Sequence, residues 1–513
     1  MRIISLVAIL ATGCAAESNS ELELSATGRA IPPVVFGTSL PNLALMPAVL
    51  PQNGGAYAYT LSMPAGANLW KVPTAPGLAD GACMDLSNPV FYVHAAPVSS
   101  PHRNDWILFV PGGGAVQGVD NVVASWFDEP TGGSTHGEMS SQWAPPSISP
   151  GGILDPTDVR NPFADWNQVF IHKCSYDRFM GRRASHVEST LVDHFVTGYL
   201  PGQQFPVGTQ IPFGKQIRFA YRGHDIVDAV VDTLATTTVS YNATTMPSLA
   251  DANTVMFIGH SGGSRGATMI IDDLAAHLRA AAPGVDVRLV MDAGFDPSAE
   301  NVVNGATYPA TSYPTNDPAN GGNPLATAAA AELGFDAVWQ ADGDATCLAN
   351  EADPSVCGDV LHVLMNWIET PMYIRQDLAD KNHTTGKDAA GAPLVDCWQV
   401  AWDPNANNCY GDTFAHGGAV LDQVADLALL RTNALSHTVL GTTMPRPSGF
   451  FPACGFHDGA HTDDGFYSLL MQPNGLTTSY ANGLLTWYRF PNVAIRSVEV
   501  NVPPTIPTGC AYP

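Results

Sequence analysis

The chain has 513 residues, of which 45% are hydrophobic, so it can bury a large core, and its length alone would allow two or three domains. Acidic residues outnumber basic ones by 47 to 22, and the net charge of −25 argues against nucleic acid as a partner. The same charge opposes binding of a polyanion unless a local basic cluster, such as Arg178, Arg182 and Arg183, relieves the repulsion.

The first predicted segment is an export signal over residues 1–14. It begins with one basic residue, Arg2, and continues with apolar residues 3–11, which are too few to span a bilayer. It ends in Ala-Thr-Gly-Cys14, which is similar to a bacterial lipoprotein cleavage site, so Cys14 is a candidate for lipidation. Residues 15–30 would then be a polar tether, and a lipid on Cys14 the only membrane contact. An ordinary secretory signal is the alternative.

A candidate oxyanion loop follows the first strongly predicted strand. Residues 106–110, Trp-Ile-Leu-Phe-Val, are apolar and rich in aromatic and β-branched side chains, which favours a buried strand. Pro111 and three glycines come next, and glycine lets a carbonyl approach the backbone closely. The backbone N–H groups of Gly113 and Gly114 are therefore candidate oxyanion donors. A flexible turn is the alternative.

Two long stretches between core elements, 118–151 and 301–354, are rich in Gly, Pro, Asn and Ala. Both are predicted to be irregular insertions that form a cap and shape the substrate pocket.

The clearest catalytic motif is Gly-His-Ser261-Gly-Gly at residues 259–263. Residues 254–258 before it favour a buried strand, and residues 264–282 after it carry apolar side chains at helical spacing. Strand, G-x-S-x-G and helix in this order are typical of a nucleophile elbow, where small residues let the chain turn and expose the serine hydroxyl. Ser261 is thus the candidate nucleophile and the Gly262 N–H a third oxyanion donor. The alternative is a plain glycine turn.

Candidates for the acid and the base follow later strands. Residues 371–376 are strand-like, and Asp377 and Asp380 come directly after them. A second apolar stretch leads to His457, with His461 four residues on. Serine, acid and histidine in this order are typical of α/β-hydrolases.

A zinc site at His457 and His461 is the rival interpretation of the histidine pair. The spacing is that of H-E-x-x-H, but Asp458 stands where the glutamate would be, and Gly459 disfavours the required helix.

Taken together, the motifs resemble the pectin acetylesterase and Notum family of serine carboxylesterases. The resemblance runs from about Cys83 to about Tyr488 and implies one α/β-hydrolase domain over 31–513, with a mostly parallel sheet flanked by helices and no cofactor or metal. It favours Asp380 as the acid and His457 as the base. The matching blocks are 106–114, 152–154, 161–162, 166–169, Cys174 with Gly181, 221–223, 261–263, 292–295, 371–380 and 452–457.

The family resemblance implies removal of acyl groups, acetyl foremost, from an exported polysaccharide or another small ester substrate. Notum-like removal of longer acyl chains is the alternative, and a catalytically inactive binding lipoprotein is a second one. The chain departs from the family at Ala115 and Val116, where Trp and Cys are common, and at Gly262, where alanine is usual. These small residues predict a more open pocket mouth.

Nine cysteines less Cys14 leave an even number, which suits up to four disulfides in an oxidising compartment. The family resemblance adds one pairing to those that short spacing suggests. The local candidates are Cys347–Cys357 and Cys397–Cys409, the resemblance implies Cys83–Cys174, and Cys454–Cys510 remain by exclusion.

Overall fold

The computed structural model describes residues 69–75, 81–127, 139–195, 208–294, 338–377 and 448–490, with gaps at 114, 117, 142–143, 242, 342, 353, 359, 453–456, 458, 469 and 472–477, and a few short strands outside these ranges. The predicted signal and tether lie outside the described residues.

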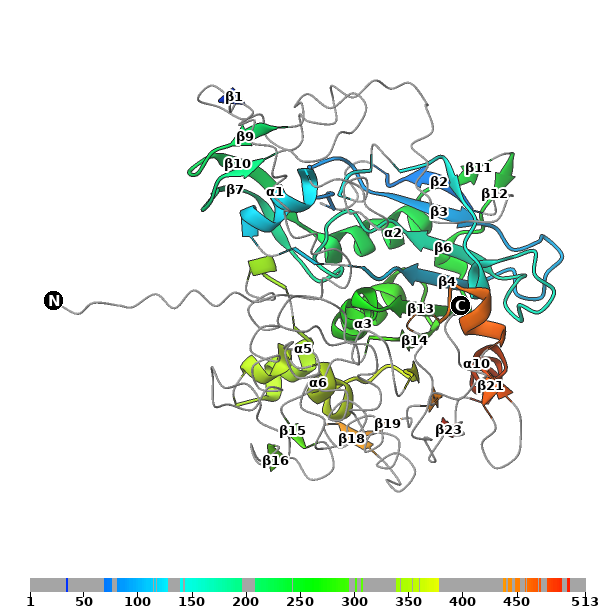
Figure 1. Cartoon of the computed structure of the whole chain (residues 1–513). Helices are drawn as coiled ribbons and strands as arrows, with labels where there is room; N and C mark the ends of the chain where they lie inside the picture. The colour runs from blue at the N-terminus through cyan, green and yellow to red at the C-terminus, as the bar shows by residue number, and fades with distance from the viewer. Residues whose placement is uncertain are drawn as a thin grey trace.

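A mostly parallel sheet forms the centre of the fold (Figure 1). Ten strands of the described residues belong to it, parallel from β23 to β6 and antiparallel from β6 to β5. In spatial order they are β23 (Arg496–Val498), β20 (Ser448–Phe451), β17 (Met372–Arg375), β14 (Asp286–Asp292), β13 (Thr254–His260), β4 (Asp105–Val110), β6 (Asn167–Ile171), β3 (Val90–His94), β2 (Leu69–Pro73) and β5 (Ser147–Ile148).

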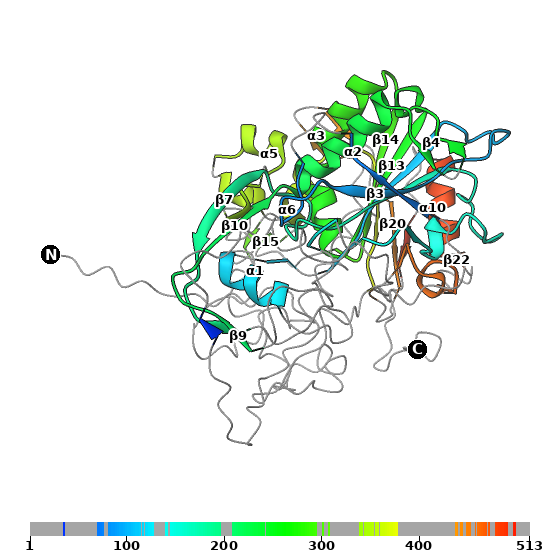
Figure 2. The ribbon, with the colours of Figure 1, turned by 90° about the horizontal axis from the view of Figure 1, so that it is seen from above.

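Helices cover both faces of this sheet, and Figure 2 shows α2 (Gly223–Thr236) and α3 (Gly262–Ala281) on one side and α10 (Tyr480–Arg489) on the other. The central strand β13 is buried along its whole length because both of its faces are covered. Its side chains alternate between two apolar clusters, with Phe257 packed on the α3 side and Ile258 on the α10 side. This is the predicted α/β-hydrolase architecture, and that prediction is confirmed.

The remaining described elements lie outside the central sheet and the three helices named above. None of the described helices is both long and apolar enough to span a membrane. These elements are α1 (Gly118–Phe127), α5 (Ala345–Asn350), α6 (Val360–Asn366), the antiparallel pair β7 (Arg183–Ser189) and β10 (Gln216–Tyr221), the single-turn helices Gly152–Leu154, Leu249–Asp251, Pro354–Gly358 and Asp464–Ser468, and the short strands β1 (Val34–Val35), β8 (His194–Phe195), β9 (Thr209–Ile211), β11 (Ser240–Tyr241), β12 (Thr244–Thr245), β15 (Glu300–Asn301), β16 (Ala306–Thr307), β18 (His437–Val439), β19 (Thr442–Met444), β21 (Leu470–Met471) and β22 (Thr478–Ser479).

The expectation of irregular structure over 118–151 and 301–354 was wrong in part. The first stretch contains α1 and β5, and the second contains α5. Helix α1 forms because Val119, Val122, Val123 and Trp126 follow helical spacing and are all buried. Most of the second stretch lies outside the described residues, so its role as a cap stays a prediction.

Two of the predicted disulfides are confirmed. Cys83 pairs with Cys174 at a Cα–Cα distance of 4.7 Å, and Cys347 pairs with Cys357 at 5.8 Å. The first bond ties the segment before β3 to the segment after β6, close to the candidate site. The other predicted pairs, Cys397–Cys409 and Cys454–Cys510, lie outside the described residues.

Candidate active site

Ser261 occupies the sharp turn between β13 and α3, with φ 50° and ψ −124°. A positive φ is strained for any residue other than glycine and is the conformation of a nucleophile elbow. The flanking glycines are required by space: a Cβ at Gly259 would lie 2.5 Å from the Gly263 carbonyl oxygen, and one at Gly263 would lie 2.4 Å from that of Pro111. The predicted strand, turn and helix are therefore all present.

His457 contacts this serine directly. Its Nε2 lies 2.7 Å from the Ser261 Oγ, although the two residues are 196 positions apart. They meet because β13 and β20 are parallel and end at the same edge of the sheet. The backbone carbonyl of His457 accepts a hydrogen bond of 2.8 Å from the Arg375 Nη1, which fixes the position of the histidine.

Arg375 lies at the centre of a buried ion cluster beneath His457. Its Nη1 is 3.4 Å from the Asp292 Oδ1, and its Nη2 is 2.5 Å from the Asp377 Oδ1, with all three side chains 0% exposed. Asp377, one of the two candidate acids, is thus paired with a structural arginine. Asp380, the other, lies outside the described residues.

Asp292, at the end of β14, organises the backbone around the nucleophile. Its carbonyl accepts the Ser261 N–H at 2.8 Å, and its carboxylate accepts the Ala460 N–H at 2.8 Å and lies 3.0 Å from the His260 Nδ1. Burial alone would raise the pKa of this carboxyl, but the His260 hydrogen bond and the Arg375 charge outweigh burial and hold the pKa below its ordinary value. The carboxylate is therefore ionised.

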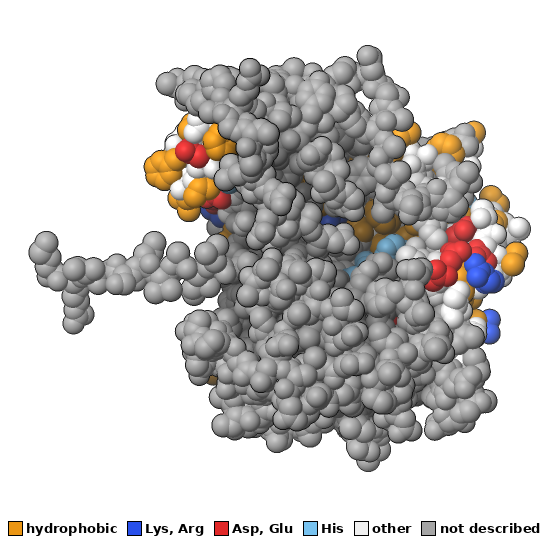
Figure 3. Space-filling model, in the orientation of Figure 1, with side chains coloured by type: hydrophobic (Ala, Val, Ile, Leu, Met, Phe, Trp, Pro, Cys, Tyr) orange, Lys and Arg blue, Asp and Glu red, His pale blue; other side chains and the backbone are white. Residues whose placement is uncertain are grey.

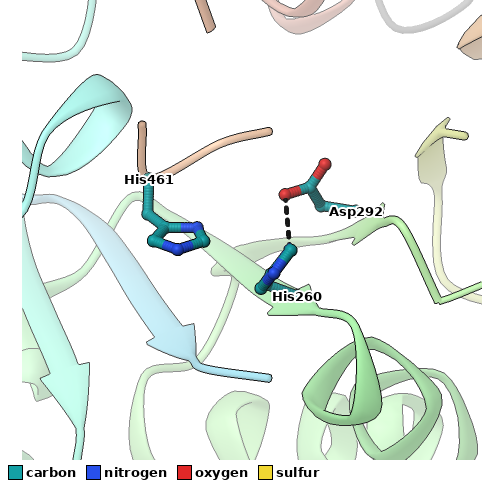
Figure 4. A group of neighbouring side chains, drawn as sticks. All are labelled: His260, Asp292 and His461. Carbon is teal, nitrogen blue, oxygen red and sulfur yellow. Dashed lines mark hydrogen bonds and ion pairs between the residues drawn. The ribbon is translucent and has the colours of Figure 1, made fainter. Parts of the chain in front are cut away.

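His461 lies beside His260 and Asp292, whereas the zinc interpretation had paired it with His457. Its ring lies 4.5 Å from that of His260, and in Figure 4 these two rings and Asp292 converge from three chain segments. His457 instead bonds to Ser261. The sequence argument missed His260 because it occupies a variable position of the serine motif, and it used Asp292 only as part of a family block.

The glycine loop after β4 lies against the nucleophile. A Cβ at Gly112 would come within 2.4 Å of the Ser261 Cβ, and one at Gly262 within 2.9 Å of the Gly113 carbonyl oxygen. Gly113 has φ +118°, which side chains rarely adopt. Gly113 and Gly262, two of the three candidate oxyanion donors, are thus neighbours. Gly114 lies outside the described residues.

Val116, which the family comparison placed near the pocket mouth, is buried. Its carbonyl accepts a hydrogen bond of 2.9 Å from the indole N–H of Trp339. Val116 is therefore part of the hydrophobic core and does not open the pocket mouth. Its neighbour Ala115 is half-buried beside the glycine loop.

Two buried cations flank the glycine loop. The Lys173 Nζ would be 1.9 Å from a Cβ at Gly113, and the Arg178 side chain 3.4 Å from a Cβ at Gly262. The Lys173 ammonium also lies 4.1 Å from the centre of the Tyr176 ring. The glycine loop of this acidic chain is thus flanked by two positive side chains, and Lys173 had been missed because it stands alone in sequence.

The basic cluster expected from sequence is otherwise neutralised. Arg182 contacts the carboxylates of Asp225, Asp228 and Asp273. Arg183 pairs with Glu188. Only Arg178 of the three arginines lies at the site.

The segment that carries Lys173 and Arg178 is held by Asp177. Its carboxylate accepts the Ser175 hydroxyl and the backbone N–H groups of Phe179 and Gly223 at 2.5, 3.1 and 2.7 Å. Tyr176, Arg178 and Phe179 have φ between 52° and 64°, so these bonds maintain a strained turn.

Burial raises the pKa of Asp177 from 3.8 to about 6. The raised pKa means that the folded protein favours the protonated form of Asp177. This preference stabilises the fold fully below pH 3.8, and the stabilisation is lost as the pH rises through about 6. Between pH 3.5 and 7, we expect the free energy of unfolding of the wild type to fall by roughly 3 kcal/mol relative to that of Asp177→Asn. Denaturant unfolding of both proteins across this range measures the difference, and parallel stability curves would contradict the assignment.

Comparisons with known proteins bear on the family and the fold. A family model described as pectinacetylesterase matches residues 72–510. Among solved structures, the Wnt deacylase Notum from Drosophila matches with a TM-score of 0.53 and 18% identity, over 85% of this chain and 97% of that chain. A second crystal form of the same protein gives a TM-score of 0.51 and 18% identity, over 84% and 98%. No curated protein matches the sequence significantly. The structural likeness supports the fold.

Proposed function

This chain belongs to the pectinacetylesterase family, and from that premise we propose that it is a serine carboxylesterase with Ser261 as the nucleophile. The 2.7 Å contact between the Ser261 Oγ and the His457 Nε2 carries the proposal. His457 takes the hydroxyl proton as Oγ attacks the ester carbonyl, and then gives it to the departing alcohol. Water, activated by the same histidine, hydrolyses the acyl-enzyme and releases the acid.

Asp380 is the proposed acid that orients His457. The Asp377 carboxylate is already paired with Arg375 at 2.5 Å, which favours the other candidate. Arg375 would serve as a positioning residue, because it binds the His457 carbonyl and so fixes the loop that carries the base.

The proposed oxyanion hole consists of the backbone N–H groups of Gly113, Gly114 and Gly262. The closeness of Gly113 to Gly262 and of Gly112 to Ser261 supports it. Lys173 and Arg178 add positive potential where the negative charge develops.

Gly113→Ala tests the oxyanion loop. At φ +118° an alanine is strained, and its Cβ would displace the Lys173 ammonium. We expect kcat to fall by about 10²–10³, the usual cost of one lost donor, with little change in KM. Gly284→Ala is the matched control, since Gly284 also has a positive φ but lies in open space away from the site. Equal activities of the two variants would refute the loop's role.

For the substrate we propose a short acyl ester, acetyl first, on an exported polysaccharide. Family membership supports this class, and the Lys173 and Arg178 cations allow a carboxylate-bearing polymer despite the −25 net charge. Removal of longer acyl chains is the second candidate, which the fold likeness to Notum favours.

A panel of p-nitrophenyl esters from acetyl to palmitoyl, together with acetylated pectin and acetylated xylan, distinguishes the candidates. We expect the highest kcat/KM on acetyl esters and release of acetate from at least one polymer. Cleavage of only the long-chain esters would favour the second candidate.

We further propose that the protein is exported as one catalytic domain over 31–513. The two disulfides support an oxidising compartment. Lipidation of Cys14 is the finer proposal, and mass spectrometry of the membrane-extracted protein tests it.

A further inference from the structure

The His260, Asp292 and His461 side chains form a compact group that the proposed esterase mechanism does not use. Each offers one atom that could bind a metal ion, and these three atoms lie within 4.8 Å of one another. The residues come from the end of β13, the end of β14 and the loop after His457, and their side chains converge in Figure 4.

The chemistry of this group suits a divalent transition metal. Two imidazoles and one carboxylate are a common protein ligand set for zinc, which leaves one position for water. Ligand atoms of a tetrahedral zinc site lie ~3.4 Å apart, as zinc–ligand bonds of about 2.1 Å require. The His260 Nδ1 and the Asp292 Oδ2 are hydrogen-bonded at 3.0 Å, which is close to this spacing, and the ion would replace the shared proton. Since the three ligand atoms lie within 4.8 Å of one another, the His461 ring would have to approach the other two by up to about 1.4 Å.

Charge and outer hydrogen bonds also favour a cation here. Asp292 and Asp377 carry two negative charges against one positive charge on Arg375, so the buried cluster has a net negative charge. The Ala460 N–H, at 2.8 Å, holds the Asp292 carboxylate in place, as partners of ligating carboxylates do. Gly459 permits this approach, because a Cβ there would lie 2.2 Å from the Asp292 Oδ1.

His461 is the most exposed member of the group. His260 and Asp292 are buried, and His461 is the half-buried member. Histidine and hydrophobic side chains are visible near the centre of the face drawn in Figure 3.

We propose that His260, Asp292 and His461 bind one zinc ion, which fastens the loop carrying His457 to the ends of β13 and β14. The ion would sit next to the nucleophile, since His260 directly precedes Ser261, and the His260 and His457 rings are 5.2 Å apart. Its role is to position the loop. Ester cleavage itself stays with Ser261 and His457.

The test is calorimetric titration of the untagged, chelator-treated full chain with Zn²⁺ at neutral pH. We expect one equivalent with a Kd below about 10 µM, and a rise in Tm of about 3 °C at saturation. His461→Ala should weaken binding at least 30-fold and abolish the rise in Tm. His461→Cys should restore binding, because a thiolate also ligates zinc.

His102→Ala is the control, because His102 also faces a carboxylate, Asp105, at 2.7 Å, but lies outside the group. It should bind zinc as the wild type does. With Co²⁺, the wild type and the control should show the visible absorption of a tetrahedral site, and His461→Ala should not. Absence of stoichiometric binding, or binding that His461→Ala leaves intact, would overturn the proposal. These readouts need no esterase activity, so they are independent of the proposed function.

Discussion

Replacing Ser261 by alanine is expected to reduce kcat on p-nitrophenyl acetate by about 10⁴–10⁶, because no other group can form the acyl-enzyme. The Tm should be unchanged or slightly higher. Alanine at φ 50° is as strained as serine, and the change removes only a hydroxyl whose partner is the His457 Nε2. Initial rates and thermal melts of the two purified proteins measure both quantities.

Ser264→Ala is the matched control for this variant. Ser264 is one helical turn away in α3, fully buried, with its side chain packed against Gly294. Its loss should leave activity within a few-fold of the wild type. A Ser261→Ala enzyme with near-normal activity would end the serine-esterase proposal, and equal losses in both variants would point to disturbed packing of the helix.

The central fold could be predicted because its strands are short, continuous apolar runs. Strands β4 and β13 are buried on both faces, so most of their residues are apolar and the strand is recognisable from sequence. Helix α1 was missed because its four buried side chains lie in a segment that begins with glycine and contains Asn121. The Gly- and Pro-rich composition of residues 118–151 favoured a loop, although the apolar residues of α1 already had helical spacing.

Prediction of the site succeeded where one motif imposes the geometry and failed where side chains from distant segments meet. The elbow requires Gly259 and Gly263 within five residues of each other, so it is visible in sequence. The contact of Asp292 with His260 and Arg375 spans 32 and 83 positions, and neither short spacing nor composition reveals it. Lys173 likewise reaches Gly113 only through the fold.

The second large effect is expected from Asp380→Asn, which should lower kcat by about 10⁴ because the histidine would lose the group that fixes its tautomer. The KM should change little, since the interaction matters mainly in the transition state. The pH profile of kcat should shift as well, because an amide cannot stabilise the imidazolium form of His457.

Asp377→Asn separates the two candidate acids because Asp377 is paired with the buried Arg375. Its carboxylate lies 2.5 Å from the Arg375 Nη2, and both side chains are 0% exposed. Removing one partner of a buried ion pair costs roughly 3–5 kcal/mol, and Asp292 compensates part of that loss. This variant should therefore lose several degrees in Tm while retaining most of its kcat below its melting range. If Asp377→Asn instead lost activity at full stability and Asp380→Asn kept it, Asp377 would be the acid, and Arg375 would be its catalytic partner.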